Sequence, residues 1–203
     1  MPKEVIFVVD PMCSWCWGFV PVIESLRLNS NYPCSVVVGG LRGAGEMVWD
    51  SSSKNYLKRH WAQVAKSTGQ VFNTALFEKE TFDYNTHSAC KAIVTVRELF
   101  GMKRAFEYLH ILQEAFYVHS NDITEIDTLL VLLKPLGIDT DIFKTFYESD
   151  RAQVLMEHDF AKARSMGANA FPSVVIIDSD GHMVCQKGYR SLEEMNNLGS
   201  SKL

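Results

Sequence analysis

Two cysteines stand close together near the start of the chain, in the segment Cys13-Ser14-Trp15-Cys16. They follow a run of apolar residues typical of a buried strand and open a stretch with helical spacing. Unpaired backbone N–H groups and the helix dipole stabilise an anion at such a place, so the Cys13 thiol is expected to ionise more easily than a free cysteine. The spacing also brings the second sulfur within bonding reach. The pair therefore predicts thiol-disulfide exchange, with Cys13 attacking a substrate disulfide and Cys16 resolving the mixed disulfide.

The alternatives for such a pair are one half of a zinc site or two buried structural cysteines. A four-cysteine zinc site needs a second close pair, and the other three cysteines, Cys34, Cys90 and Cys185, are scattered. No two histidines lie four residues apart, the spacing that would place both on one face of a helix. We therefore expect no metal site, and the position between strand and helix favours redox chemistry.

The elements that must position the pair are predicted at both ends of the chain. Residues 4–9, 14–28 and 34–38 read as strand, helix and strand, which is a βαβ unit. Pro21 lies inside this helix, and the apolar spacing beyond it favours a helix that continues through a kink. Residues 173–178 and 182–187 flank a turn and predict a hairpin, followed by a short helix over 191–198.

The middle of the chain, residues 45–167, shows almost no strand signal. Its amphipathic stretches predict helices over residues 52–68, 85–100, 103–118, 125–136, 140–149 and 151–166. Strand-bearing ends around a helical middle predict an α/β fold, in which residues 1–44 and 168–203 form one sheet-containing domain and residues 45–167 an all-helical insertion. The insertion contains no cluster of nucleophile, base and orienting group, so we expect it to influence substrate choice without taking part in the chemistry.

Composition and charge exclude some classes of partner. With 203 residues and 47% hydrophobic content, the chain can bury a full core without a metal or disulfide staple. Its formal net charge of −4 argues against nucleic acid, and no apolar run reaches the ~20 residues that span a bilayer. We expect a cytoplasmic protein, or a periplasmic one if a signal peptide has been removed. The sequence leaves the oligomeric state open and slightly favours a monomer.

Three segments carry a resemblance to a known family. They are Asp10-Pro11-Met12-Cys13-Ser14-Trp15-Cys16-Trp17-Gly18-Phe19, Ser88-Ala89-Cys90-Lys91-Ala92 and Gly167-Ala168-Asn169-Ala170-Phe171-Pro172-Ser173. With them the chain resembles, over nearly its whole length, the DsbA-like thiol-disulfide oxidoreductases of the thioredoxin superfamily, in particular the FrnE-type and predicted protein-disulfide isomerase subgroup. The resemblance implies a thioredoxin-like fold with a large all-helical insertion.

The resemblance also implies roles for individual residues. Cys13 is the exposed nucleophile, Cys16 its buried partner, and Pro172 a cis-proline that faces them. Ser14, Trp15, Phe171 and Pro172 would contact substrate, which would be a protein or small-molecule disulfide or thiol. No cofactor beyond the redox-active disulfide is implied, with glutathione as a possible reductant. The dipeptide between the cysteines lacks the histidine of DsbA, which is a proposed stabiliser of the thiolate, so we do not expect this protein to be a very strong oxidant. The direction of electron flow stays open.

Two other functions compete with this one. Glutathione-dependent transferases and isomerases resembling the kappa class share the fold, but generally place a serine where this chain has Cys13. A non-enzymatic holdase or adaptor would instead use the apolar surface around Trp15 and the insertion to bind partners. Retention of both cysteines favours electron exchange.

Other residues near the pair have simpler interpretations. Asp10 could shuttle a proton to Cys16, but an aspartate before proline is also a common turn starter, and we favour the turn. Trp15 is expected to lie exposed beside Cys13, whereas Trp17 and Cys90 are expected to pack in the core.

Overall fold

The sheet that carries the pair is formed from both ends of the chain. The computed structural model describes residues 2–29 and 32–202, and its four strands are β1 (Pro2–Val9), β2 (Cys34–Val38), β3 (Ser173–Asp178) and β4 (Met183–Lys187). Their order in the sheet is β2-β1-β3-β4, with β2 parallel to β1 and with β3 antiparallel to both β1 and β4. The predicted α/β class is confirmed.

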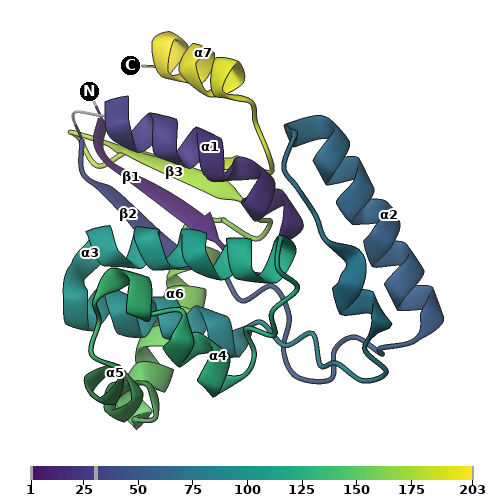
Figure 1. Ribbon diagram of the computed structural model, residues 1–203. Helices are drawn as coiled ribbons and strands as arrows, with labels where there is room; N and C mark the ends of the chain where they lie inside the picture. The colour runs from purple at the N-terminus through teal and green to yellow at the C-terminus, as the bar shows by residue number, and fades with distance from the viewer. Residues whose placement is uncertain (1, 30–31, 203) are drawn as a thin grey trace.

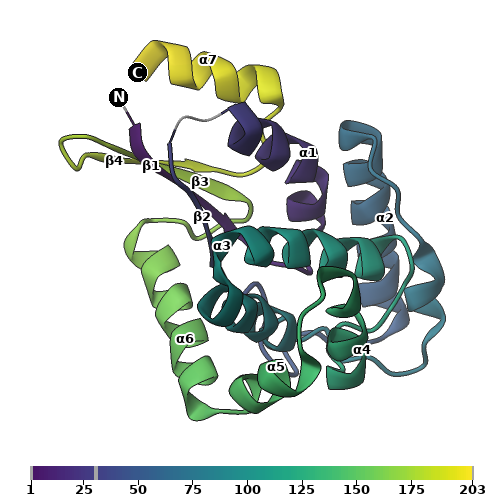
Figure 2. The ribbon, with the colours of Figure 1, turned by 60° about the vertical axis from the view of Figure 1, so that its left-hand side comes forward.

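Helices cover both faces of this sheet (Figure 1). Successive side chains of a strand point to opposite faces, so Phe7 and Val9 pack in one core cluster while Ile6 and Val8 pack in another. The first cluster contains residues of α1 (Ser14–Asn29) and Met195 of α7 (Leu192–Lys202). The second contains residues of α6 (Asp150–Ser165) on the opposite face, which is visible in the turned view (Figure 2).

The remaining helices lie between β2 and β3 in the sequence. They are α2 (Ser51–Thr68), α3 (His87–Tyr117), α4 (Ile126–Val131) and α5 (Thr140–Tyr147), with short 3₁₀ helices η1 (Thr74–Glu78) and η2 (Lys134–Leu136). Helix α2 packs beside α1, whereas α3 runs along the β2 edge of the sheet (Figures 1 and 2). Because α6 lies directly on the sheet, part of this helical segment forms a layer of the sheet domain itself.

Side chains of α3 and α6 make hydrogen bonds with backbone groups of the edge strand β2. Arg97 of α3 donates through Nη1 to the carbonyl of Val36, at 2.8 Å. Its guanidinium also makes a bidentate ion pair with the Asp159 carboxylate of α6, at 2.6 and 2.8 Å. Asp159 in turn accepts a hydrogen bond from the backbone N–H of Val38, at 3.0 Å. An edge strand normally exposes such groups, and here helix side chains satisfy them. The ion pair therefore joins both helices to the sheet.

We predict that Asp159→Ala lowers the free energy of unfolding by about 3 kcal/mol or more, because it leaves the Arg97 charge and the Val38 N–H without their partner. Urea denaturation measures the change. Glu98→Ala is the matched control, since it removes the exposed ion pair with Arg151, and it should cost less than about 1 kcal/mol. Equal losses in the two variants would contradict a special role for the Asp159 pair.

Candidate functional site

The two cysteines lie at the N-terminus of α1. The carbonyl of Cys13 accepts the first helical hydrogen bond, from the backbone N–H of Trp17 at 3.0 Å, and the N–H of Cys13 donates to the carbonyl of Asp10 at 3.1 Å. Cys13 therefore stands immediately before the helix, where the first-turn N–H groups have no partner within the helix. Both cysteines are free thiols, with exposed fractions of 7% for Cys13 and 0% for Cys16.

A loop that precedes β3 lies against the first of these thiols. The peptide bond between Phe171 and Pro172 is cis, which confirms the prediction. The Cys13 thiol donates to the carbonyl of Phe171, with a sulfur-oxygen distance of 3.5 Å. The Phe171 ring occupies the space above Gly39, where an added Cβ would come within 2.0 Å of the ring. A glycine at the end of β2 thus allows the loop to approach the pair.

A buried carboxylate lies behind the second thiol. The backbone N–H of Asp10 contacts the Cys16 sulfur at 3.5 Å, and the Asp10 side chain is fully buried. Burial raises the pKa of Asp10, and hydrogen bonds from Leu41, Thr86 and other donors partly oppose it. Burial also raises the pKa of the Cys16 thiol well above its ordinary value, and the neighbouring Cys13 adds to the effect.

The Asp10 side chain forms the turn that the sequence favoured, and the contact of Asp10 with the Cys16 sulfur is through its backbone N–H. Its Oδ1 accepts a hydrogen bond from the N–H of Met12, at 2.8 Å, which forms the turn before the helix. Its Oδ2 accepts hydrogen bonds from the N–H of Leu41 and the hydroxyl of Thr86, both at 2.7 Å. A thiol with a raised pKa needs a base to lose its proton, and a buried carboxylate whose own pKa is raised can take it.

Three predicted site residues are less accessible than expected. Trp15 is half-buried rather than exposed, because its ring packs against Tyr189 and His60, with ring centroids 5.4 and 6.2 Å apart. Ser14 is buried, and Cys13 is more enclosed than the resemblance implies. Trp15 is therefore covered by α2 and by the segment before α7, whereas the Phe171 loop lies against Cys13.

Two residues that were expected in the core do pack there. Trp17 is buried, stacks on Tyr117 and donates from Nε1 to the carbonyl of Val71, at 3.0 Å. Cys90 is fully buried on α3, but its sulfur also lies 3.4 Å from Oδ2 of Asp10. Sequence reasoning missed the second contact and missed Thr86 altogether. No local pattern signals either, because these residues lie 80 and 76 positions from Asp10.

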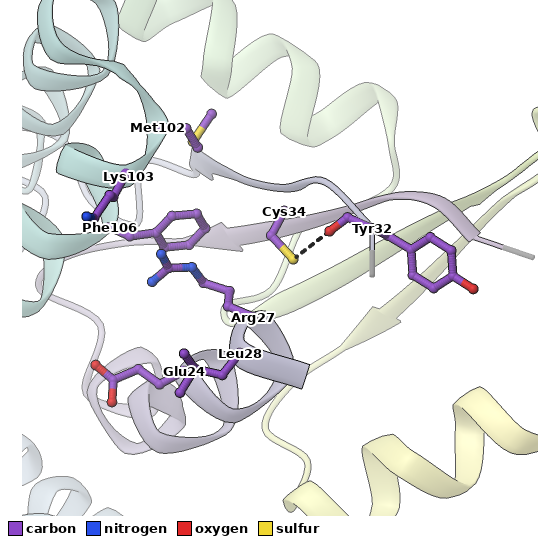
Figure 3. Close-up of a pocket in the computed structure, with 8 residues that line it drawn as sticks. All are labelled: Glu24, Arg27, Leu28, Tyr32, Cys34, Met102, Lys103 and Phe106. Atoms are coloured by element: carbon purple, nitrogen blue, oxygen red, sulfur yellow. Dashed lines mark hydrogen bonds between the residues drawn. The ribbon is translucent and has the colours of Figure 1, made fainter. Parts of the chain in front are cut away.

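A separate cavity of about 530 Å³ opens at the other end of α1 (Figure 3). The Cys34 thiol lies in its wall and contacts the carbonyl of Tyr32 at 3.6 Å, while the Arg27 guanidinium stacks on the Phe106 ring at 3.9 Å. None of the residues around Cys13 and Cys16 lines this cavity. Cys34 therefore belongs to a different environment from the close pair.

One group of side chains in the described residues is close enough together to hold a metal ion. It consists of Asp178, Asp180 and His182 in the turn between β3 and β4. The backbone N–H groups of Asp180 and His182 both donate to Oδ1 of Asp178, at 2.9 Å, so these contacts are explained by the turn itself. Within 2–29 and 32–202, no helix has the length and apolar character needed to cross a bilayer.

Comparison with known proteins places this chain in a family. A family model described as thioredoxin matches residues 6–197. The chain belongs to the thioredoxin family. A solved structure from Nitrosomonas europaea, described as a candidate protein disulfide isomerase, is 28% identical, with a TM-score of 0.86 and coverage of 99% of this chain and 97% of that one. The cytosolic disulfide reductase DsbM from Pseudomonas aeruginosa is 21% identical, with a TM-score of 0.75 and coverage of 91% and 89%.

These neighbours confirm the thioredoxin-like fold with a helical insertion and the similarity to DsbA-like oxidoreductases. A curated relative of another description is the ClpXP adapter protein SpxH from Bacillus subtilis, which is 22% identical over 179 residues. The match covers 88% of this chain and 59% of that protein. The thioredoxin-family chain thus spans less than two thirds of the length of the adapter proteins that it matches.

We predict that Cys13 is the first cysteine to react with iodoacetamide, since it stands at a helix N-terminus, where unpartnered N–H groups favour attack by its sulfur, and Cys16 is fully buried. Brief substoichiometric labelling at about pH 6, where ordinary thiols with a pKa of about 8.5 stay protonated, followed by mass mapping, measures the order. The half-buried Cys34 and Cys185 serve as internal controls for access without activation. Earlier labelling of Cys16, Cys34 or Cys185 would show that the nucleophile is misassigned.

A second prediction concerns the pH dependence of stability. The folded pKa of Asp10 is raised above 3.8, so the native state holds this proton to a higher pH than the unfolded chain does. The free energy of unfolding then falls as the pH rises from about 3.8 through the folded pKa, by up to about 1.4 kcal/mol per pH unit. Asp10→Asn removes this loss, so the variant should gain stability relative to the parent protein across that window, as urea denaturation at several pH values would show.

The control for this experiment is Asp50→Asn. Asp50 is the exposed cap of α2, and the backbone N–H of Ser53 holds its pKa below the usual value, so its ionised form favours the folded state. The stability of Asp50→Asn relative to the parent protein should therefore fall with rising pH. If both variants showed the same pH dependence, the conclusion that the ionised form of Asp10 disfavours the folded state would be wrong.

Proposed function

We propose that this protein is a thiol-disulfide oxidoreductase in which Cys13 is the nucleophile and Cys16 the resolving cysteine. The observation that carries the proposal is the arrangement of the pair: Cys13 faces the Phe171 carbonyl, and Cys16 is buried next to Asp10. These contacts support a division in which Cys13 meets the substrate and Cys16 gives its proton to a base. The similarity to disulfide reductases and isomerases supports the same chemistry.

In the reducing direction, the thiolate of Cys13 attacks one sulfur of a substrate disulfide. This forms a mixed disulfide and releases the first substrate thiolate, which takes a proton from solvent. Cys16 then gives its proton to the Asp10 carboxylate, and its thiolate attacks the sulfur of Cys13. The second substrate sulfur leaves as a thiolate that takes a proton from solvent, Asp10 later releases its proton to solvent, and two electrons have passed from the dithiol to the substrate. Oxidation of a substrate dithiol follows the same steps in reverse.

The loop before β3 is our proposed substrate-binding surface, with Phe171 and Pro172 on one side of the pair and Ser14 and Trp15 on the other. In the dithiol, the Phe171 carbonyl accepts a hydrogen bond from the Cys13 thiol. Once Cys13 has lost its proton, the carbonyl is free to accept a hydrogen bond from the backbone of an extended substrate. Because Ser14 is buried and Trp15 half-buried, we assign most of the contact to Phe171.

We further propose that protein or small-thiol disulfides are the substrates, that glutathione resets the pair, and that the protein works in the cytoplasm as a reductase. DsbM, a cytosolic disulfide reductase of similar fold, has also been solved with GSH. The Ser-Trp dipeptide agrees with this direction, since it lacks a histidine that could stabilise the Cys13 thiolate and so favour an oxidant.

A second candidate function is that of an adaptor, which the match to the SpxH proteins favours. An adaptor needs a binding surface and would keep its activity without either cysteine. The two candidates are therefore separated by variants that remove the thiols and leave the surface in place.

We predict that the protein catalyses the reduction of insulin disulfides by glutathione. Cys13→Ser should lower the rate at least about a hundredfold, because a serine hydroxyl is not a nucleophile for disulfides under these conditions. Cys16→Ser should accumulate a mixed disulfide at Cys13, which mass spectrometry detects. Cys185→Ser is the matched control and should leave the rate unchanged.

Two outcomes would contradict this proposal. Full insulin reduction by Cys13→Ser would remove the pair from the reaction. Conjugation of glutathione to an electrophile by the parent protein, without disulfide reduction, would instead place it with the kappa-class-like transferases. Retention of partner binding by the Cys13→Ser and Cys16→Ser double variant, with no redox activity in the parent protein, would favour the adaptor.

A further inference from the structure

Two side chains from the start of α3 converge on the carboxylate of Asp10, the residue whose backbone N–H contacts the Cys16 sulfur. The Thr86 hydroxyl donates to Oδ2 of Asp10 at 2.7 Å, and the Cys90 thiol donates to the same oxygen at 3.4 Å. All three side chains are fully buried. Thr86 and Cys90 are four residues apart, so they lie on one face of the helix, and that face is turned to Asp10. The contact joins the helical segment to the chemistry-bearing end of α1.

The Thr86 hydroxyl contacts Asp10 and does not cap the N-terminus of α3. Threonine directly before a helix normally caps a free N–H group of the first turn with its side-chain oxygen. Thr86 holds that position before α3, yet its side chain makes no capping hydrogen bond. The hydroxyl instead accepts a hydrogen bond from the N–H of Arg42, at 3.3 Å, and donates to Asp10 at 2.7 Å, which is shorter than its 3.3 Å distance to the Arg42 carbonyl. A capping hydrogen bond typically stabilises a helix by about 1 kcal/mol. The Thr86 hydroxyl therefore contributes its hydrogen bond to Asp10 and not to the stability of α3.

The Cys90 thiol is suited to remain a donor. Burial raises its pKa well above the ordinary value, and the nearby Asp10 carboxylate raises it further. Cys90 therefore keeps its proton, which can point to Oδ2 of Asp10. In the opposite direction, the hydrogen bonds from Thr86 and Cys90 lower the pKa of Asp10 against the effect of burial.

Asp10 faces few other ionisable groups. They come from α1, from the segment before α3 and from α3 itself: Cys16, Tyr84, Cys90 and Tyr117, with Arg42 stacked over the Tyr84 ring as the nearby cation. Tyr84 and Tyr117 have raised pKa values because of burial, so both are neutral at physiological pH. Within residues 2–29 and 32–202, the side chains that give hydrogen bonds to the Asp10 carboxylate are the hydroxyl of Thr86 and, of the ionisable groups, the thiol of Cys90 alone.

We propose that Thr86 and Cys90 are positioning residues for disulfide exchange, which hold the Asp10 carboxylate ready to accept the proton of Cys16. This inference rests on the proposed function and adds a role for the helical segment. From the sequence, the segment was expected to take no part in the chemistry. Through these two side chains, α3 controls the step in which Cys16 resolves the mixed disulfide, while Cys13 attacks substrate without its help.

The test is a single turnover of the reduced protein with oxidised glutathione. Attack by Cys13 releases a first glutathione thiol, and attack by Cys16 releases a second, so the two steps appear as two phases of thiol release. The variants are Thr86→Val and Cys90→Ala, which remove the donors, and Thr86→Ser and Cys90→Ser, which keep them. The rate of each phase is followed as a function of pH.

We expect Thr86→Val to slow the second phase about tenfold near neutral pH and to move its pH midpoint up by about one unit, as loss of a hydrogen bond to a charged group requires. Cys90→Ala should act in the same direction with a smaller effect, because its hydrogen bond is longer. The first phase should change little. Thr86→Ser and Cys90→Ser should restore the second phase.

Thr95→Val is the matched control. Thr95 is buried on the same helix, and its hydroxyl has no hydrogen-bond partner, so the same substitution there should leave both phases unchanged. An unchanged second phase in Thr86→Val and Cys90→Ala, or equal slowing of both phases, would overturn the positioning role. Failure of the parent protein to release any thiol would instead overturn the proposed function.

Discussion

The arrangement of the site depends on one constraint, the burial of the Asp10 carboxylate. An ionisable acid without solvent is costly unless hydrogen bonds replace the water. The chain supplies those bonds from the turn at Met12, from Leu41 after β2 and from Thr86 before α3. Three segments that are distant in sequence must therefore meet at this point, and their meeting fixes the first turn of α1, where both cysteines lie.

The same meeting point divides the two thiols into different environments. Cys13 lies on the side of the cis-proline loop, and its proton is directed to a carbonyl near the surface. Cys16 lies on the inner side, where burial and the neighbouring Cys13 disfavour its thiolate. These different surroundings of two identical side chains support the proposed division, in which Cys13 starts an exchange and Cys16 finishes it. The asymmetry is a property of the packing around α1 rather than of the cysteine motif alone.

Elements with a regular local pattern could be predicted closely from the sequence. The strands over 34–38 and 173–178 were placed at their observed bounds, and the helix of α1 continues past Pro21 as expected. Helices 85–100 and 103–118 were predicted as separate, and the single label α3 does cover two helical stretches that are divided at Gly101, where the backbone is not helical, with φ of 85° and ψ of 171°. The stretch 125–136 breaks into α4 and η2, the latter containing Pro135.

Only part of the site could be predicted from the sequence. The cysteine pair and the Phe171-Pro172 loop have distinctive local patterns, but Thr86 and Cys90 reach Asp10 only through the packing of α3. The half-buried state of Trp15 likewise depends on His60 of α2, which no local pattern relates to it. Periodicity identifies the buried face of a helix, but not which polar group that face will meet.

The completed edge of β2 has a consequence for the order of folding. Two of its backbone groups have their partners in Arg97 and Asp159, which follow 61 and 121 residues later. A chain emerging from the ribosome therefore presents this edge long before the side chains that cover it exist. Closing such long loops is slow, and an uncovered edge can pair with another chain. During synthesis, this topology therefore exposes the β2 edge to pairing with other chains until α6 has folded against it.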